Sequence, residues 1–452
     1  MTPPDTGKPF HWIPSLYFAQ GLPYVAVMTL SVVMYKNLGL SNTDIALYTS
    51  WLYLPWVIKP LWAPLLELIG TKRGWIVGMQ LLVGGGLAAV GLALPVDGFV
   101  RWTLLAFWLM AFSSATHDIA ADGFYMLALR EHQQAAFVGV RSTFYRLAMI
   151  AGQGGLVYLA GTLQARSGSF VEAWMGVFLL LAMAFFLLAA YHRWVLPRPP
   201  NDVALAGPAT EPGAAPPLVP RKQRRALVTA VGAMAAPAFV RDFVAIFVAF
   251  FKRPGIGVML AFLLLYRFPE AQLLKLAVPF LLDPPSAGGL GLSTQDVGIV
   301  YGTVGVTALT IGGILGGLAI ARFGLRQALW PLVLCVHLPN LIFVLLAVYQ
   351  PGNPWLVGSA LAVEQFGYGF GFTAYLLYMI MISQGPHQTA HYAICTGFMA
   401  LGMMLPGMLS GWLQAQLGYR NFFIWICVAA IPSLYVVSRV KIDARFGRKD
   451  SA

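Results

Sequence analysis

The sequence predicts an all-α membrane protein with twelve transmembrane helices in two six-helix bundles, and three observations lead to this prediction. The 452 residues are 58% hydrophobic and 10% charged, whereas about 25% of residues are charged in an average soluble domain. Apolar runs of eighteen or more residues recur along most of the chain, and a run of that length can cross a bilayer as a helix. An internal repeat then divides these runs into six and six.

The chain order of the spans predicts the domains. Residues 1–196 form an N-terminal six-helix bundle, and residues 254–446 form a C-terminal six-helix bundle with a short cytoplasmic tail at 447–452. The cytoplasmic linker at 197–253 begins with a Pro/Ala-rich stretch and ends in an amphipathic helix over 226–251, which we expect at the membrane surface. The predicted spans lie at about 12–35, 43–68, 74–95, 102–129, 135–164, 171–196, 255–282, 295–321, 327–349, 354–383, 389–416 and 420–439.

The internal repeat has an offset of 254 residues. This offset aligns APLLELIGTKR, which follows the second span, with GLAIARFGLR, which follows the eighth, so that Gly70 matches Gly324. It also aligns QAAF at 134–137 with QTAH at 388–391, where the fifth and eleventh spans begin. Duplicated halves are typical of transporters that bind their substrate between the halves.

The net charge of +12 is distributed unevenly between the two sides of the predicted membrane. About twenty Lys and Arg residues fall on the side that carries both termini, and only Lys36, Arg101, Arg166 and Arg420 fall on the other. This asymmetry predicts that both termini are cytoplasmic. The basicity is therefore a topology signal, and the expected partner is the lipid bilayer rather than nucleic acid.

The main functional signal is the stretch HDIAADGFYMLALREHQQAAFVGVRSTFYR, which places four ionisable side chains within two apolar spans. Such side chains are costly at membrane depth and normally face a bundle interior or a water-filled path. Asp118 and Asp122 are four residues apart and share one helix face, where repulsion and burial both favour the protonated form. Arg141, Arg146 and Lys59 are expected at the same depth. The group either binds protons or substrate, or it forms an ion-pair network that locks the bundle.

The second bundle carries its own charged set. Arg267 and Glu270 are three residues apart and can pair with each other, and Lys275 is expected to reach the outer interface. The proton-coupling candidates are Asp118, Asp122, Glu270 and Glu364. The substrate or charge-pair candidates are Lys59, Arg141, Arg146, Arg267, Gln20, Tyr125, Tyr145, Gln365, Tyr368 and Tyr375.

Two of these candidate groups have a structural alternative. Tyr368 and Tyr375 offer an aromatic surface suited to sugar rings, although aromatic residues at helical spacing also serve as packing. AQGLPY at 19–24 predicts a break in the first span that would expose backbone groups to a cavity. No catalytic triad, phosphate loop or metal-ligand spacing falls on an aqueous face, so we expect neither an enzyme nor a cofactor, with the proton as coupling ion.

The two repeated turns resemble the Gly-x-x-x-Asp-Arg-x-Gly-Arg-Lys signature of the major facilitator superfamily, which implies that superfamily's fold. In the first turn Glu67 stands at the acidic position, with Gly70, Lys72 and Arg73 following it. In the second turn Ala321 replaces the acid, while Gly324 and Arg326 remain. The resemblance implies that both turns latch conformations rather than contact substrate.

SATHDIAADGFY at 114–125 resembles the Ala-x-Gln-Asp-Ile-x-x-Asp motif of the AmpG-type muropeptide permeases, with His117 in place of Gln. Supporting matches are SLYFAQGLPY, IKPLWAPLLE, YRLAM, LYRFPEA and STQDVGIVYGTVG. The resemblance implies a proton-driven importer of the bacterial inner membrane that carries anhydro-muropeptides released in cell-wall recycling. Tyr301 and Gly302 replace an Asn-Lys pair expected from the family. The alternative is a facilitator-type importer of another solute, such as an oligosaccharide or a siderophore. In either case we expect a monomer.

Overall fold

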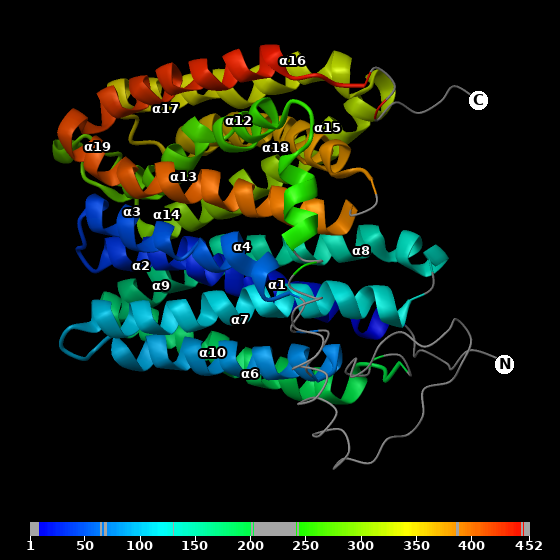
Figure 1. Cartoon of the computed structure of the whole chain (residues 1–452). Helices are drawn as coiled ribbons and strands as arrows, with labels where there is room; N and C mark the ends of the chain where they lie inside the picture. The colour runs from blue at the N-terminus through cyan, green and yellow to red at the C-terminus, as the bar shows by residue number, and fades with distance from the viewer. Residues whose placement is uncertain are drawn as a thin grey trace.

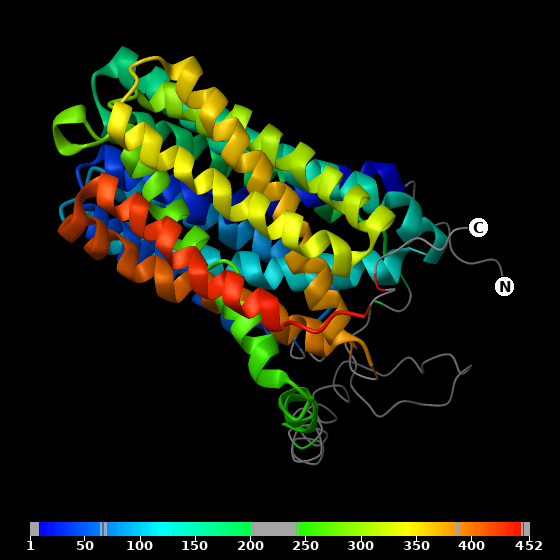
Figure 2. The ribbon, with the colours of Figure 1, turned by 90° about the horizontal axis from the view of Figure 1, so that it is seen from above.

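The computed structural model describes residues 9–63, 66, 70–129, 131–199, 202, 241, 244–385, 388–443 and 446. Regular structure in this part of the chain is helical, which confirms the predicted all-α fold class. Glu67 of the first repeated turn, most of the linker and the C-terminal tail lie outside the described residues. Of the amphipathic helix expected over 226–251, residues 241 and 244–251 are described and helical, and Figure 2 shows them projecting beside the start of α19.

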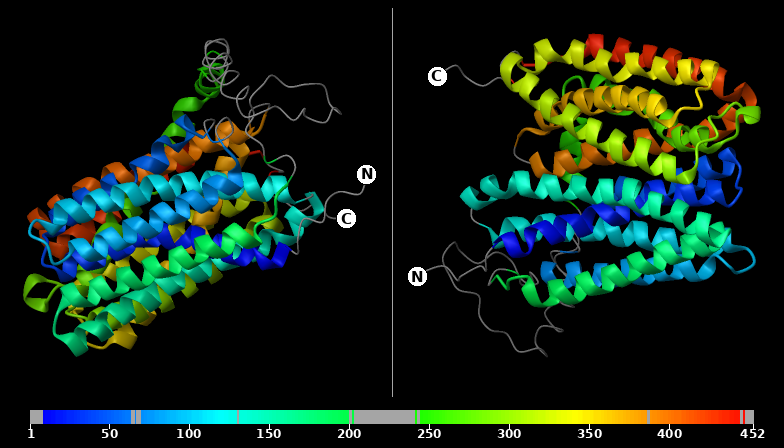
Figure 3. Two further views of the ribbon diagram at one scale, coloured as in Figure 1. Left: turned by 90° about the horizontal axis from the view of Figure 1, so that it is seen from below. Right: turned by 180° about the vertical axis from the view of Figure 1, so that it is seen from behind.

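The described helices account for twelve membrane crossings. Nine helical stretches are long and apolar enough to span a membrane. The stretches at 42–61 and 131–167 add two crossings, and the long helix α19 adds one more because Gly418, with φ of 71°, divides it into two. The chain enters its first helix and leaves its last one at the same end, here called the terminal face; the opposite end is the distal face (Figures 1 and 3).

The first half of the chain supplies the lower layer in Figure 1 and the second half the upper layer. The elements of the first half are α1 (Ile13–Val25), η2 (Ala26–Leu30), α2 (Ser31–Asn37), α3 (Asn42–Trp51), α4 (Leu54–Ile58), η3 (Lys59–Leu61), α6 (Lys72–Ala93), α7 (Phe99–Ala128), α8 (Glu131–Ile150), η4 (Ala151–Leu156), α9 (Val157–Ser167) and α10 (Phe170–Val195). Those of the second half are α12 (Ile256–Leu265), α13 (Phe268–Leu282), α14 (Thr294–Val297), η6 (Gly298–Gly305), α15 (Val306–Phe323), α16 (Leu325–His337), η7 (Leu338–Asn340), α17 (Leu341–Tyr349), α18 (Pro354–Ser383) and α19 (Gln388–Arg439).

The aligned glycines of the two repeated turns share one backbone feature. Gly70 and Gly324 both adopt a positive φ, 75° and 80°, a region that L residues with a side chain rarely enter. Gly324 directly precedes α16 of the second half, and Gly70 lies one residue further from α6 of the first half, before the N-cap Thr71. The sequence alignment of these turns therefore reflects a shared structural requirement for glycine.

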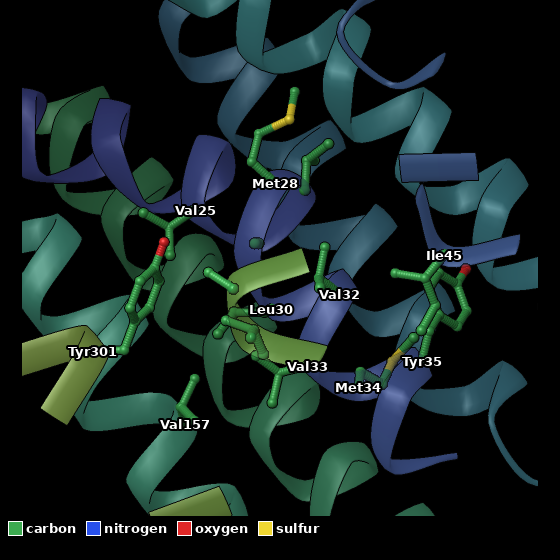
Figure 4. Packing of buried hydrophobic residues seen from close by; sticks show 14 of the residues in the cluster. Val25, Met28, Leu30, Val32, Val33, Met34, Tyr35, Ile45, Val157 and Tyr301 are labelled. Carbon is green, nitrogen blue, oxygen red and sulfur yellow. The ribbon is translucent and has the colours of Figure 1, made fainter. Parts of the chain in front are cut away.

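The buried apolar residues show how the halves meet. One large cluster contains residues of both halves, and Figure 4 shows Tyr301 of η6 beside Val25 and Val157 of the first half. Toward the terminal face this shared core gives way to two separate clusters. One contains only first-half residues, such as Phe124, and the other only second-half residues, such as Tyr375. The halves therefore share one apolar core near the distal face and have separate apolar cores toward the terminal face.

Candidate functional site

Two ion pairs lie in the first half, where four helices converge. The Lys59 ammonium lies 2.7 Å from Oδ2 of Asp118, and the Arg141 guanidinium lies 3.0 Å from Oδ1 of Asp122. Gln20 of α1 donates a further hydrogen bond to Asp118. Because helical spacing places both aspartates on one face of α7, each meets a cation from a different neighbouring helix, η3 or α8.

These ion pairs are not sealed from solvent. The side chains of Asp118 and Asp122 are 25% and 39% exposed, and those of Lys59 and Arg141 are 21% and 33% exposed. The carboxylates are therefore compensated by cations and yet partly exposed. This arrangement is compatible with a site that exchanges protons. It is also compatible with a structural ion-pair network in which protonation of an aspartate would weaken its ion pair.

Arg141 is further held by aromatic rings. Its guanidinium lies 4.6 Å from the ring centroid of Tyr17 and 5.5 Å from that of Tyr125. The Tyr17 hydroxyl also donates a 3.3 Å hydrogen bond to Asp122. Tyr125 was among the sequence candidates, whereas Tyr17 was not, because a tyrosine of the first span carries no signal of its own.

Arg146 is separated from the two ion pairs. Within the described residues it makes no ion pair, and its guanidinium lies against Gly313 of α15 in the second half. Tyr145 lies beside Gly21 of α1 with both its carbonyl and its ring, and its hydroxyl interacts electrostatically with Asp118 and Asp122. Of the three cations expected near the aspartates, two bind them and the third faces the other half.

The predicted break in the first span is wrong in position. Residues 20–23 are helical, and the irregular turn follows them as a π-helix at Ala26–Leu30. A break occurs instead in the seventh span, where α12 ends at Leu265 and α13 begins at Phe268, with Pro269 in its first turn. Proline is tolerated in a first helical turn because its missing N–H has no partner there.

This break in the seventh span positions Arg267. Of the two alternatives for Arg267, pairing with Glu270 is not found at ion-pair distance, and the guanidinium instead donates to the hydroxyl of Tyr368. It also lies 4.7 Å from the ring centroid of Phe372. Arg267 is the residue that caps α13, so it leaves the helix at an angle that turns it away from the carboxylate three residues later.

Two buried carboxylates lie behind this arginine. Glu270 is fully buried in the first turn of α13, and neither carboxylate oxygen has a hydrogen-bond partner among the described residues. The Asn340 amide, which is also unpartnered, lies beside it. Glu364 of α18 accepts a 3.0 Å hydrogen bond from Gln365 and interacts electrostatically with Glu270. Among the described residues, neither glutamate has a cation at ion-pair distance.

A central cavity of about 130 Å³ lies between the halves. Among the sequence candidates Arg267, Gln365 and Tyr368 line it, whereas Tyr375 lies in the second-half core and donates its hydroxyl to the Leu263 carbonyl. The expectation that Tyr375 stacks on a sugar is therefore not supported by its position. The polar lining residues that sequence reasoning missed are Tyr24, Thr29, Tyr53, Gln153, Lys275 and Tyr301.

Lys275 differs most from expectation. Instead of reaching the membrane interface it is 4% exposed and donates a 2.9 Å hydrogen bond to Thr49 of α3 in the other half. Gly302, where the resemblance led us to expect a lysine, packs directly against the backbone of Gln153 of η4. A side chain at Gly302 would collide with that backbone. In this conformation the cavity cations are therefore Arg267 and Lys275 of the seventh span, and none comes from η6.

The halves are joined at the distal face by a polar network that the sequence did not reveal. The Lys36 ammonium lies 2.6 Å from Oδ1 of Asp283, whose other oxygen accepts a 2.7 Å hydrogen bond from Tyr419. Asn42 donates to Gln414 and Tyr419. These residues end one span or begin the next, so the network closes the distal end of the cavity.

The repeated turns differ between the halves. In the first turn Arg73 donates to the carbonyls of Leu196 and Arg193 at the end of α10, and the Asp202 carboxylate accepts from the backbone N–H groups of Lys72 and Arg73. In the second turn Arg326 is exposed and makes no polar contact within the described residues. The first turn is thus fixed to the end of its own half.

Comparison with known proteins decides the family. The model of the Major Facilitator Superfamily matches residues 15–390. The chain belongs to the major facilitator superfamily. The predicted resemblance to AmpG-type permeases is also confirmed by curated relatives. The anhydromuropeptide permease of Escherichia coli K12 is 26% identical over 434 residues, which cover 93% of this chain and 77% of that protein. A Rickettsia conorii protein named as transporter AmpG 4 is 21% identical over 432 residues, covering 93% and 94%.

Solved structures of superfamily members share the fold. A bacterial homologue of the human lysosomal transporter Spinster, in an inward-facing and unoccupied conformation, aligns with a TM-score of 0.64 at 15% identity and covers 96% of each chain. The inward-open xylose transporter XylE from E. coli aligns with a TM-score of 0.62 at 13% identity and covers 95% of each chain. The predicted architecture of two six-helix bundles is confirmed by these likenesses.

Proposed function

We propose that this transporter is a proton-coupled importer of anhydro-muropeptides or related glycan-peptides, which works by alternating access across the bacterial inner membrane with the terminal face in the cytoplasm. Superfamily membership supports transport, and the anhydromuropeptide permease of E. coli suggests the cargo. The observation that carries proton coupling is the pair of accessible aspartates, each bound to one cation from another helix.

Protonation of either aspartate would change the balance between conformations. A neutral Asp118 holds Lys59 less strongly, and η3, which carries Lys59, also packs against α19 of the other half. A change at the aspartate can therefore reach the contact between the halves. A coupled carrier requires such a difference in interaction between its two states.

The central cavity is small for a transporter of glycan-peptides, as expected for a conformation that is closed at the distal face. A volume of about 130 Å³ is below the roughly 300–1,000 Å³ of most ligand pockets. A glycan-peptide therefore needs a larger cavity than this conformation provides. We expect the cavity to enlarge in the state that opens to the distal face.

Uptake by purified protein in proteoliposomes tests the proposal. We expect labelled anhydro-disaccharide-peptide to accumulate at least about tenfold faster when the side of the distal face is acidic, and a protonophore to abolish the increase. Asp122→Asn should remove the response to the gradient, and Asp97→Asn, at an exposed position outside the site, should keep it. Unchanged stimulation in Asp122→Asn would reject the coupling role. Preferential uptake of a neutral oligosaccharide or a siderophore would reject the cargo.

A further inference from the structure

Lys275 is a buried lysine that proton coupling at the two aspartates does not use. Its ammonium donates to Thr49 and lies 5.1 Å from the ring centroid of Tyr53. Within the described residues no carboxylate lies at ion-pair distance from it. Removing an ammonium from water costs roughly several kcal/mol. The Thr49 hydroxyl and the Tyr53 ring offset this cost less than an anion would.

Arg267 is a second cavity cation on the same helix. Only 9% of its surface is exposed, and its Nε has no hydrogen-bond partner among the described residues. One terminal nitrogen donates to Tyr368, which holds the guanidinium in place and leaves other donors free. Arg267 caps the start of α13 and Lys275 lies inside that helix, about two turns further along it. Both residues line the central cavity.

The charge balance distinguishes these cations from the others in the membrane. Lys59 and Arg141 are already compensated by Asp118 and Asp122. The second half has Glu270 and Glu364, but neither lines the cavity and neither forms an ion pair with Arg267 or Lys275. The described cavity wall therefore presents two cations and no anion.

We infer that Lys275 and Arg267 form a two-point anion site, so that the cargo is a glycan-peptide carrying carboxylates at two separate positions. The inference rests on the proposed function in one respect, because it takes this cavity as the cargo site. A carboxylate at Lys275 replaces the neutral Thr49 acceptor with a charge-assisted bond, and Arg267 offers a planar fork for the second. A neutral oligosaccharide would leave both charges buried without a partner.

Equilibrium binding to the detergent-purified full-length protein tests this site without any proton gradient. One probe is an anhydro-disaccharide-peptide with free carboxylates, and the other is the same molecule with its carboxylates converted to methylamides. We expect the free acid to bind at least about tenfold more tightly, because each charged hydrogen bond typically contributes a factor of ten or more. Lys275→Met should weaken binding of the acid by about ten- to hundredfold and leave binding of the amide unchanged.

Three further variants separate a direct role from a structural one. Lys275→Arg keeps the charge and should retain most of the preference for the acid. Thr49→Val removes the hydrogen-bond acceptor between the halves but not the charge, so the preference should persist. Lys252→Met removes an exposed lysine outside the cavity and serves as the matched control. Each variant is used only if it elutes as a single folded species in size-exclusion chromatography.

The results that overturn the inference are distinct from those that reject proton coupling. Equal affinity for acid and amide in the unmodified protein overturns it, as does a preference that survives Lys275→Met or disappears in Thr49→Val. Failure of both probes to bind also overturns it, because the inference commits to glycan-peptide carboxylates. A protein that prefers the acid but ignores the proton gradient retains the anion site and loses only the coupling mechanism.

Discussion

Lys36 of α2 and Asp283 at the end of α13 form an ion pair of 2.6 Å that joins the two halves at the distal face. The two side chains are 14% and 16% exposed, so water screens the interaction only partly. Asp283 also accepts hydrogen bonds from Asn42 and Tyr419, which come from the two halves. Closure of the distal face therefore depends on one acidic residue with partners on both sides.

Replacing Lys36 with Met should shift the protein toward the state open at the distal face. The loss of a partly buried ion pair is expected to favour opening by about 1–3 kcal/mol, because Asp283 keeps only neutral partners. Spin labels at Ser167 and Ser286, one in each half and both exposed, would report the change as a longer distance. Cys335, Cys395 and Cys427 are first replaced so that only these sites are labelled.

The charge-reversed pair Lys36→Asp with Asp283→Lys provides the control for this measurement. It should restore the short distance at least in part, because the attraction between the two positions is kept. A distribution of distances in Lys36→Met that matches the unmodified protein would show that packing, and not the ion pair, holds the face closed.

Gly302→Ala should hinder closure of the same face through sterics. A Cβ at this position would collide with the backbone of Gln153 in the other half, and a backbone cannot move aside as a flexible side chain can. We expect transport to fall more than about tenfold while the protein remains folded. Gly155→Ala is the matched control, since that glycine lies in the neighbouring π-helix and has nothing within 4 Å of the added carbon. Equal activity of both variants would contradict the close contact of η4 with η6.

Lys59 and Asp118 should show a large energetic coupling in a double-mutant cycle. Lys59→Met alone leaves the carboxylate without its cation, and we expect it to lower the free energy of unfolding by about 1–3 kcal/mol. Lys59→Met combined with Asp118→Leu should cost less than the sum of the two single changes, because neither charge is then left unpaired. Denaturation in detergent micelles measures all four proteins. Additive effects would mean that the 2.7 Å contact contributes little.

Arg73→Gln should destabilise the first half, whereas Arg326→Gln should not. Arg73 donates to two carbonyls at the end of α10, and loss of these charged hydrogen bonds is expected to cost about 1–3 kcal/mol. Arg326 occupies the equivalent turn of the second half but makes no polar contact within the described residues. Thermal unfolding of the two variants compares them directly. A similar fall in melting temperature for both would indicate a role in the conformational cycle that this state does not show.

Local periodicity explains what could be predicted from sequence. The spacing of Asp118 and Asp122 places them on one helix face, and the up-and-down order of spans brings Lys59 and Arg141 to the same depth. The repeated turns are identified by glycines that need a positive φ, which is a property of single residues. Features that follow from helix geometry and the order of the spans can therefore be predicted from the sequence.

The remaining site features depend on how helices are rotated and paired. Lys275 was expected at the interface, but the rotation of α13 directs it into the cavity toward Thr49, 226 residues earlier in the chain. The expected Arg267–Glu270 pair is absent because Arg267 stands at a break between two helices, where helical spacing no longer applies. Lys36 and Asp283 come from opposite halves, so no local pattern connects them.

The shared apolar core near the distal face has a consequence for the transport cycle. Opening that face would expose residues such as Val300 and Val33 to entering water, at a cost of about 25 cal/mol for each Å². Without cargo nothing offsets this cost, so an empty carrier should rest with its binding site open to the terminal face. The slow and energy-requiring step of import would then be the return of the empty protein, which is where an ion gradient has the greatest effect on turnover.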